Sequence, residues 1–142
     1  MVGDCESEIE MEDRAVALNP NSFHAWHYRG WVYKTASLPE EAVQSFGRAM
    51  RMSPVDPLLH RSLGGMGTAL IELRRFDEAI VAAKKAIRQN PFHSGAYLLT
   101  SAFAHLGCDA EAREAAVRLL EVDPDFTLLR GSLAVDNRTR SC

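Results

Sequence analysis

The sequence predicts an all-helical fold in which antiparallel helix pairs stack into a right-handed superhelix. Two observations support this prediction. Four prolines, at positions 20, 54, 91 and 124, divide the chain with a period close to 34 residues. Between the prolines, apolar residues recur every three or four positions, which places them on one face of a helix. A single helix pair cannot hide its apolar face, so successive pairs must stack to bury a core.

The repeated units agree with one another position by position. The first complete unit places large and small apolar residues in a fixed order: Trp26, Gly30, Tyr33, Ala42, Phe46, Ala49 and Pro54. A shift of 37 positions gives the second set: Leu63, Gly67, Leu70, Ala79, Ala83, Ala86 and Pro91. A further shift of 33 gives the third: Ala96, Thr100, Phe103, Ala112, Ala116, Leu119 and Pro124. The unit length is that of a 34-residue helix–turn–helix repeat.

With these residues the chain resembles the tetratricopeptide-repeat (TPR) family, over nearly its whole length. Segments such as Pro39–Pro57 and Arg75–Ile80 are also similar to repeat regions at the C-terminal end of bacterial adenylate-cyclase-like and winged-helix regulatory proteins. The first resemblance implies a scaffold that binds another polypeptide. The second implies a bacterial regulatory or signalling context.

Each unit reads as a helix A, a turn and a helix B. Asn21 or Ser22 can cap the first helix A, because short polar side chains accept bonds from free helical amides. Pro39 suits the first turn of the following helix B. Gly107 is placed to end the third helix A in a left-handed turn. Small residues are expected where the helices of a pair cross: Gly30, Gly67, Ala42 and Ala79.

The chain is therefore divided as one domain of consecutive units. Residues 4–20 are expected to form a half repeat with helix B only, which suggests a fragment or a truncated domain. Repeats follow at 21–56, 57–91 and 92–124, then a capping helix at 125–134 and a frayed tail at 135–142. The extra residues at 55–57 are expected to alter the curvature between the first two repeats.

Composition limits the class of protein. The formal charge is −3, so nothing favours nucleic acid or an acidic membrane surface. No apolar run is long enough for a membrane span, and the acidic start does not resemble a signal peptide. Cys5, Cys108 and Cys142 fit no disulfide or zinc framework. The expectation is a cytoplasmic protein.

No constellation predicts catalysis, a metal or a cofactor. His24, His27 and His105 lack the acidic or cysteine partners of a metal site. The glycines at 64, 65 and 67 lack the lysine and hydroxyl of a phosphate loop, and no strand precedes them. For Gly64 and Gly65 the hypothesis is that they allow the close approach of a ligand or another backbone. Cys108 lies one turn from His105, but a catalytic Cys/His pair also needs a shaped pocket, which the sequence does not indicate.

The TPR resemblance implies a partner-binding groove lined by helix A side chains. Carried over by phase, the groove residues are His24, His27, Trp31, Lys34, Arg61, Thr68, Glu72, Tyr97, Ser101 and His105. Trp31 is the expected anchor, because Trp26 and Tyr33 already supply the core of its unit; alternatively it packs against the preceding helix B or shields the N-terminal edge. The carboxylate-clamp residues of chaperone-binding relatives are missing from the matching positions.

The leading hypothesis is thus a non-enzymatic scaffold that binds a peptide or a neighbouring domain in the helix A groove. The alternative is a structural unit for self-assembly, in which a homodimer forms through the incomplete N-terminal edge and no peptide ligand exists.

Overall fold

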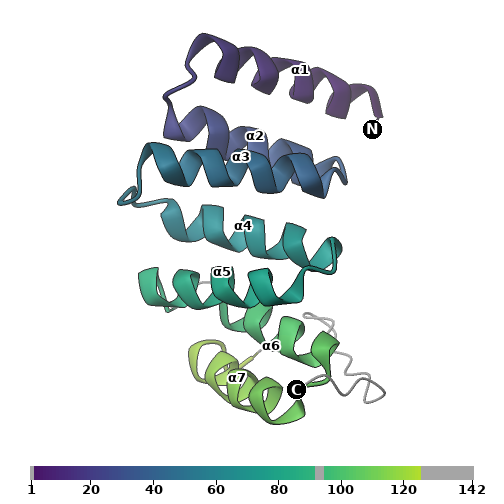
Figure 1. Ribbon diagram of the computed structural model, residues 1–142, viewed down its shortest axis with the longest axis vertical. Helices are drawn as coiled ribbons and strands as arrows, with labels where there is room; N and C mark the ends of the chain where they lie inside the picture. Colours follow the sequence, from purple (N-terminus) through teal and green to yellow (C-terminus); the bar gives the residue numbers. More distant parts are fainter. Residues whose placement is uncertain (1, 92–94, 126–142) are drawn as a thin grey trace.

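The chain folds into a stack of α-helices (Figure 1). The structure is a computed structural model that describes residues 2–91 and 95–125. Within these residues there are seven helices and no strand. Their bounds are α1 Val2–Leu18, α2 Phe23–Thr35, α3 Pro39–Met52, α4 Leu59–Glu72, α5 Phe76–Gln89, α6 Gly95–Leu106 and α7 Asp109–Val122. This confirms the all-helical prediction, whereas the expected capping helix and tail lie outside the described residues.

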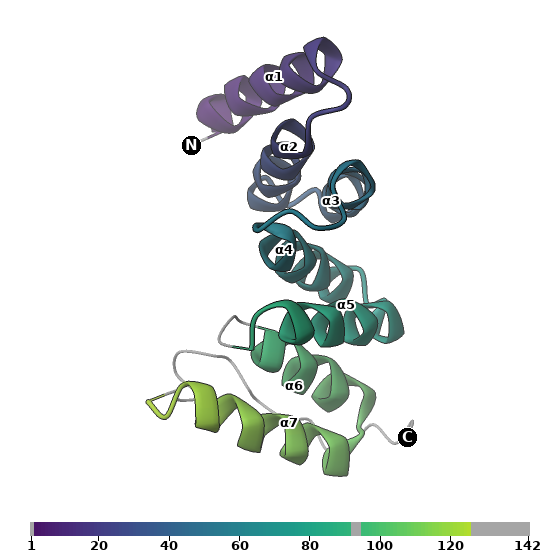
Figure 2. The same cartoon turned by 90° about the vertical axis from the view of Figure 1, so that its left-hand side faces the viewer.

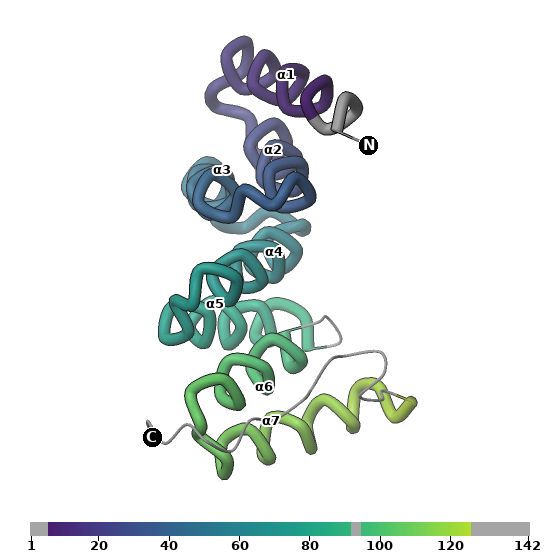
Figure 3. The backbone as a smooth tube through the Cα atoms, turned by 90° about the vertical axis from the view of Figure 1, so that its right-hand side faces the viewer, coloured from purple at the N-terminus to yellow at the C-terminus, as the bar shows by residue number. Residues whose placement is uncertain are grey.

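Consecutive helices pack as the pairs α2–α3, α4–α5 and α6–α7, and α1 packs on α2. The first helices of the pairs are also neighbours of one another, α2 beside α4 and α4 beside α6. In the turned views, α2 and α4 lie toward one side of the stack, with α3 and α5 displaced toward the other (Figures 2 and 3). The molecule therefore has two long faces, one built from helices A and one from helices B.

Each helix A ends in the same left-handed turn. Ser37, Arg74 and Gly107 occupy equivalent places in the three repeats and have φ values of 63°, 60° and 77°. The next residue donates its amide to a carbonyl five positions back, as in Leu38 to Tyr33 at 2.9 Å. This bond satisfies a carbonyl that the helix end would leave unpaired. The left-handed turn predicted at Gly107 is confirmed, and two residues other than glycine adopt it as well.

The core follows the repeat pattern. Ala42, Ala49, Ala79, Ala83 and Ala86 have no exposed surface, as their positions in the pattern predict. Their small side chains let the helices approach closely, since the interior leaves little spare volume.

Phe46 is the largest side chain that is completely buried, and two glycines make room for it. A Cβ atom at Gly30 would lie 2.7 Å from the Phe46 ring, and one at Gly65 would lie 2.5 Å from it. The group that approaches Gly65 is therefore a side chain of α3, not a ligand or another backbone as expected.

A polar cluster fixes α1 to the rest of the stack. Arg29 donates from Nε to the Asp13 carboxylate at 2.9 Å and from Nη1 to the Ser45 hydroxyl. Tyr33 donates its hydroxyl proton to the same carboxylate at 3.0 Å. Arg29 also lies over the Tyr33 ring, 4.3 Å from its centroid. One carboxylate thus orders two side chains of α2, and α1 is held at a defined position.

Two further findings concern Cys108 and the lengths of the helices. Cys108 is disulfide-bonded, which the cysteine spacing did not predict, so the expectation of a chain without disulfides is corrected. No helix in the described ranges is long and apolar enough to cross a membrane. The cytoplasmic location stays a prediction.

Candidate functional site

The expected groove residues all lie on α2, α4 and α6, which are adjacent in the stack. Their exposure differs widely. Four have exposed side chains: His24, Arg61, Glu72 and His105. Five are half-buried: Trp31, Lys34, Thr68, Tyr97 and Ser101. We call this surface the A face.

His27 is the exception, because the structure buries it. Its side chain is 2% exposed and its Nδ1 lies 2.7 Å from the Ser62 hydroxyl of α4. The ring also stacks on Phe23 with centroids 5.4 Å apart. Burial, together with the nearby charges of Arg61 and His24, lowers the pKa of His27 to about 4. The expectation that His27 lines the groove is therefore corrected: at neutral pH it is an uncharged core residue joining two repeats.

Trp31 has a mixed environment. It is half-buried and packs edge-on against Phe46, with ring centroids 5.5 Å apart. The Lys34 ammonium lies 5.6 Å from the Trp31 ring centroid, within cation–π range. Trp31 also contacts the apolar cluster around Tyr33, Ala42 and Phe46. The view that its unit has a complete core without it is corrected, since Trp31 contributes part of that core.

Tyr28 is an exposed aromatic residue that sequence reasoning missed. Its side chain is 51% exposed, and its ring lies 6.5 Å from that of His24, one turn earlier on α2. Aromatic residues lose little conformational freedom on binding and often dominate interface energetics. The spacing of four from His24 was the signal in the sequence, because it places both rings on one side of the helix.

The remaining polar residues of the A face have mostly local roles. The Thr68 hydroxyl donates to the Gly64 carbonyl at 3.0 Å, within its own helix. His105 stacks on Phe76 of α5, with centroids 5.0 Å apart. Among the residues that the structure describes, no three His, Cys, Asp or Glu side chains come together as a metal site would require. This face presents aromatic and charged side chains to solvent.

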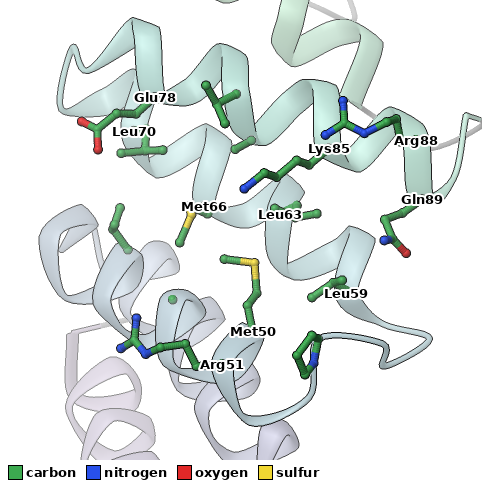
Figure 4. Close-up of a pocket in the computed structure, with 15 residues that line it drawn as sticks. Met50, Arg51, Leu59, Leu63, Met66, Leu70, Glu78, Lys85, Arg88 and Gln89 are labelled. Carbon is green, nitrogen blue, oxygen red and sulfur yellow. The ribbon is translucent and has the colours of Figure 1, made fainter.

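A concavity that sequence reasoning did not find lies between α3 and α5 with α4 as its floor (Figure 4). It encloses about 690 Å³. We call it the α3–α5 cleft. Its floor is made by Leu59, Leu63, Met66 and Leu70, which recur at helical spacing along α4. On the same helix Arg61, Thr68 and Glu72 lie on the opposite side, since two residues turn a helix by about 200°. The cleft and the A face are therefore separate surfaces.

The rim of the α3–α5 cleft is basic. Arg51 of α3 and Lys85 and Arg88 of α5 line it, and none of the three forms an ion pair with any carboxylate among the described residues. In Figure 4 the Lys85 side chain reaches over the cavity toward Met66, and Met50 faces Met66 from α3. The acidic residue of the rim, Glu78, already pairs with Arg75 at 2.6 Å. The cleft therefore combines an apolar floor with positive charge at its mouth.

Two family models match the chain in sequence. Residues 65–125 match the tetratricopeptide repeat, which spans the region from α4 to the end of α7. Residues 5–36, which include most of α1 and all of α2, match the protein prenyltransferase alpha subunit repeat. No curated protein matches the chain in sequence.

Solved structures share the fold. MamA aligns with a TM-score of 0.80 at 22% identity, over 87% of this chain and 71% of that one. YrrB, described as a TPR protein with an unusual peptide-binding site, aligns with a TM-score of 0.72 at 22% identity, over 87% of this chain and 62% of that one. Naa15/Naa10 bound to HypK-THB aligns with a TM-score of 0.56 at 18% identity, over 88% of this chain and 18% of that one.

The fold is thus that of helical repeats built from stacked antiparallel pairs, as in solved TPR structures. Within it, residues 65–125 match the tetratricopeptide repeat in sequence.

Proposed function

We propose that this protein is a non-catalytic scaffold that binds a peptide or a neighbouring domain along the A face. One observation carries the proposal: three helices of adjacent repeats present exposed aromatic and charged side chains side by side. Tyr28 is the principal anchor, and Trp31 adds the part of its ring that remains accessible. YrrB, which shares the fold, is described as having a peptide-binding site.

The charges of the A face favour a ligand with acidic groups. Arg61 is exposed on α4 and Lys34 is partly exposed on α2, whereas Glu72 is the acidic member of the set. Complementary charge raises the rate of association and selects the partner, and salt weakens both effects. The regulatory context suggested by the sequence resemblance stays a prediction.

Capture of proteins from the source cells on the immobilised chain tests the proposal, followed by affinity measurements with the partner that is identified. Tyr28→Ala should weaken that partner's binding by roughly tenfold or more, the effect expected of a central anchor. Arg61→Glu should weaken it further at low salt. The matched control is Arg113→Glu, which changes an exposed arginine on α7, away from the A face. Equal affinity in all three variants would place the binding surface elsewhere.

A second candidate function is self-assembly, and α1 supplies the observation that favours it. Met11 and Leu18 on this helix are 67% and 74% exposed, so the helix presents large apolar side chains to solvent. We propose a homodimer through this surface as the alternative. Sedimentation at tens of micromolar should then show a species larger than a monomer, which Met11→Glu and Leu18→Glu should dissociate. A monomer throughout this range contradicts the alternative.

A further inference from the structure

The α3–α5 cleft has a counterpart one repeat further along the chain. The counterpart lies between α5 and α7 with α6 as its floor, and we call it the α5–α7 cleft. The two are related by the internal repeat, because Leu70 on the first floor corresponds to Phe103 on the second and Ala82 on the first wall corresponds to Ala115. Since the backbone geometry repeats, differences between the clefts come from their side chains.

The first difference between the clefts is the residue at one equivalent position of their walls. Gly47 lines the α3–α5 cleft, and its counterpart 37 positions later is Lys84. The Lys84 ammonium lies 6.0 Å from the centroid of the Phe103 ring on the floor of its own cleft, which encloses about 540 Å³ against about 690 Å³ for the α3–α5 cleft. At Gly47 no such side chain exists, so the wall of the α3–α5 cleft is bare at this position and the cleft is somewhat larger.

Folding does not require a glycine at position 47. A Cβ atom there would meet its nearest neighbours, Met66 Cε and Arg51 Nη1, at 3.6 and 3.7 Å, which are ordinary contact distances. This contrasts with Gly30 and Gly65, where Phe46 leaves no room. Glycine inside a helix is less stable than alanine. The structural consequence of Gly47 is therefore a bare wall and added room in the α3–α5 cleft.

The second difference is charge. Arg88 at the mouth of the α3–α5 cleft corresponds to Glu121 in the α5–α7 cleft, and the exposed Val81 corresponds to Glu114. The first cleft is therefore basic and apolar, whereas its counterpart carries additional carboxylates. The shared repeat geometry does not by itself produce this contrast in charge. The contrast makes the first cleft complementary to acidic, apolar ligands.

We infer that the α3–α5 cleft is a second binding site, which takes an acidic peptide segment of a partner protein. A large apolar side chain of the peptide enters between Met50, Leu63 and Met66. Methionine side chains are unbranched and adapt to differently shaped apolar groups. Carboxylates flanking that side chain pair with Arg51, Lys85 and Arg88 at the rim. The cleft lies open between the outer sides of two exposed helices, so an extended or helical segment can lie along it.

The cleft is also independent of the A face. Its residues come from α3, from α5 and from the side of α4 opposite Arg61 and Glu72. One chain could therefore hold two ligands at once, and variants on the A face should leave peptide binding in the cleft unchanged. This separates failure of the present inference from failure of the function proposed above.

Nuclear magnetic resonance of the methionine methyl groups provides the test. The probe is a ten-residue capped peptide of alternating glutamate and leucine pairs. Two control peptides replace either the leucines with alanine or the glutamates with lysine. We expect the acidic leucine peptide to shift the Met50 and Met66 methyl resonances, with little effect from either control. Shifts confined to the A face, or equal shifts from the lysine peptide, would overturn the inference.

Variants then locate the site. Gly47→Leu should occupy part of the cleft with an uncharged side chain, and Arg88→Glu should remove the charge complementarity; each should lower peptide affinity roughly tenfold or more. Gly47→Ala keeps the cleft open and should bind the probe as the unmodified protein does. Glu121→Arg alters the equivalent position in the α5–α7 cleft and should leave the affinity unchanged. Unchanged binding by Gly47→Leu and Arg88→Glu contradicts the assignment.

A parallel titration with dodecanoate distinguishes a peptide site from a site for a small amphiphilic anion. We expect dodecanoate to shift these methyl resonances less than the acidic leucine peptide at equal concentration. The reverse order, with saturable dodecanoate binding and no peptide binding, would overturn the assignment of a peptide ligand.

Discussion

The Nδ1 atom of His27 lies 2.7 Å from the hydroxyl oxygen of Ser62, so a hydrogen bond joins α2 to α4 in the interior of the stack. Both side chains are buried, His27 with 2% of its surface exposed and Ser62 with none. A neutral imidazole can accept the hydroxyl proton or donate its own, according to its tautomer. Burial removes the water that would stabilise a charged imidazole, and the nearby charge of Arg61 disfavours it further, which is why the pKa falls.

The lowered pKa predicts a loss of stability in mild acid. The His27 pKa is about 4 in the folded protein, against an ordinary value of 6.5. Between these values the unfolded chain binds the proton more readily, so stability is complete above pH 6.5 and declines as the pH falls toward 4. The contribution lost from this one group is about 2–3 kcal/mol.

Denaturant unfolding at pH 7.5 and pH 4.5 checks this, with His27→Gln as the variant that cannot titrate. The unmodified protein should lose more free energy of unfolding between the two pH values than the variant does. Equal losses would mean that His27 is accessible to water and keeps an ordinary pKa in the folded state.

The two glycines that face different environments give a second prediction. Gly65→Ala places a methyl group 2.5 Å from the Phe46 ring. Because the ring is completely buried and has no room to move away, this substitution should destabilise the protein by about 1–3 kcal/mol. Gly47→Ala meets only ordinary contacts and should raise stability by about 0.5–1 kcal/mol. Thermal melting of both variants provides the comparison. Combining Gly65→Ala with Phe46→Leu should recover part of the loss, and the absence of any recovery would argue against this contact as its cause.

Trp31 and Tyr28 should separate stability from binding. Trp31→Ala removes a half-buried ring from its contact with Phe46 and should cost about 1–3 kcal/mol. Tyr28→Ala removes a ring that is 51% exposed and should change stability by only about 0.5 kcal/mol. Calorimetric melting of the two variants tests this. Equal melting temperatures for Trp31→Ala and the unmodified protein would restore Trp31 as a pure surface anchor.

The sequence predicts the helix pairs well because the repeat pattern reports directly on burial. Ala42 and Ala79 are completely buried where the phase of the repeat places them, and Ser22 accepts a bond from the Ala25 amide as a cap. Phase identifies the helix that carries a residue, but it does not determine side-chain exposure. His27 and Arg61 both come from groove positions, yet one is buried and the other exposed.

The α3–α5 cleft could not be predicted in the same way. It depends on the separation of two helices B and on the conformation of side chains above α4, neither of which a one-dimensional pattern records. One signal was available. Gly47 stands where the next repeat has Lys84, and comparing equivalent positions for side-chain size would have indicated a bare place on the outer side of α3. The left-handed turn at Gly107 was predictable, whereas the same turn at Ser37 and Arg74 was not, because those residues do not favour it.

The three equivalent turns supply the last prediction. Ser37 has a φ of 63°, a left-handed conformation in which a side chain is strained, whereas glycine adopts it without that strain. Ser37→Gly should therefore raise the free energy of unfolding by about 0.5–1 kcal/mol, because relief of this strain exceeds the entropy that glycine adds to the unfolded chain. Gly107→Ala is the reciprocal variant and should lower it by about 1 kcal/mol, since alanine must adopt a φ of 77° there. Denaturant unfolding of the two variants measures both effects. If the changes do not have opposite signs, the bonds around the turns, such as Leu38 to Tyr33 at 2.9 Å, determine their stability more than backbone strain does.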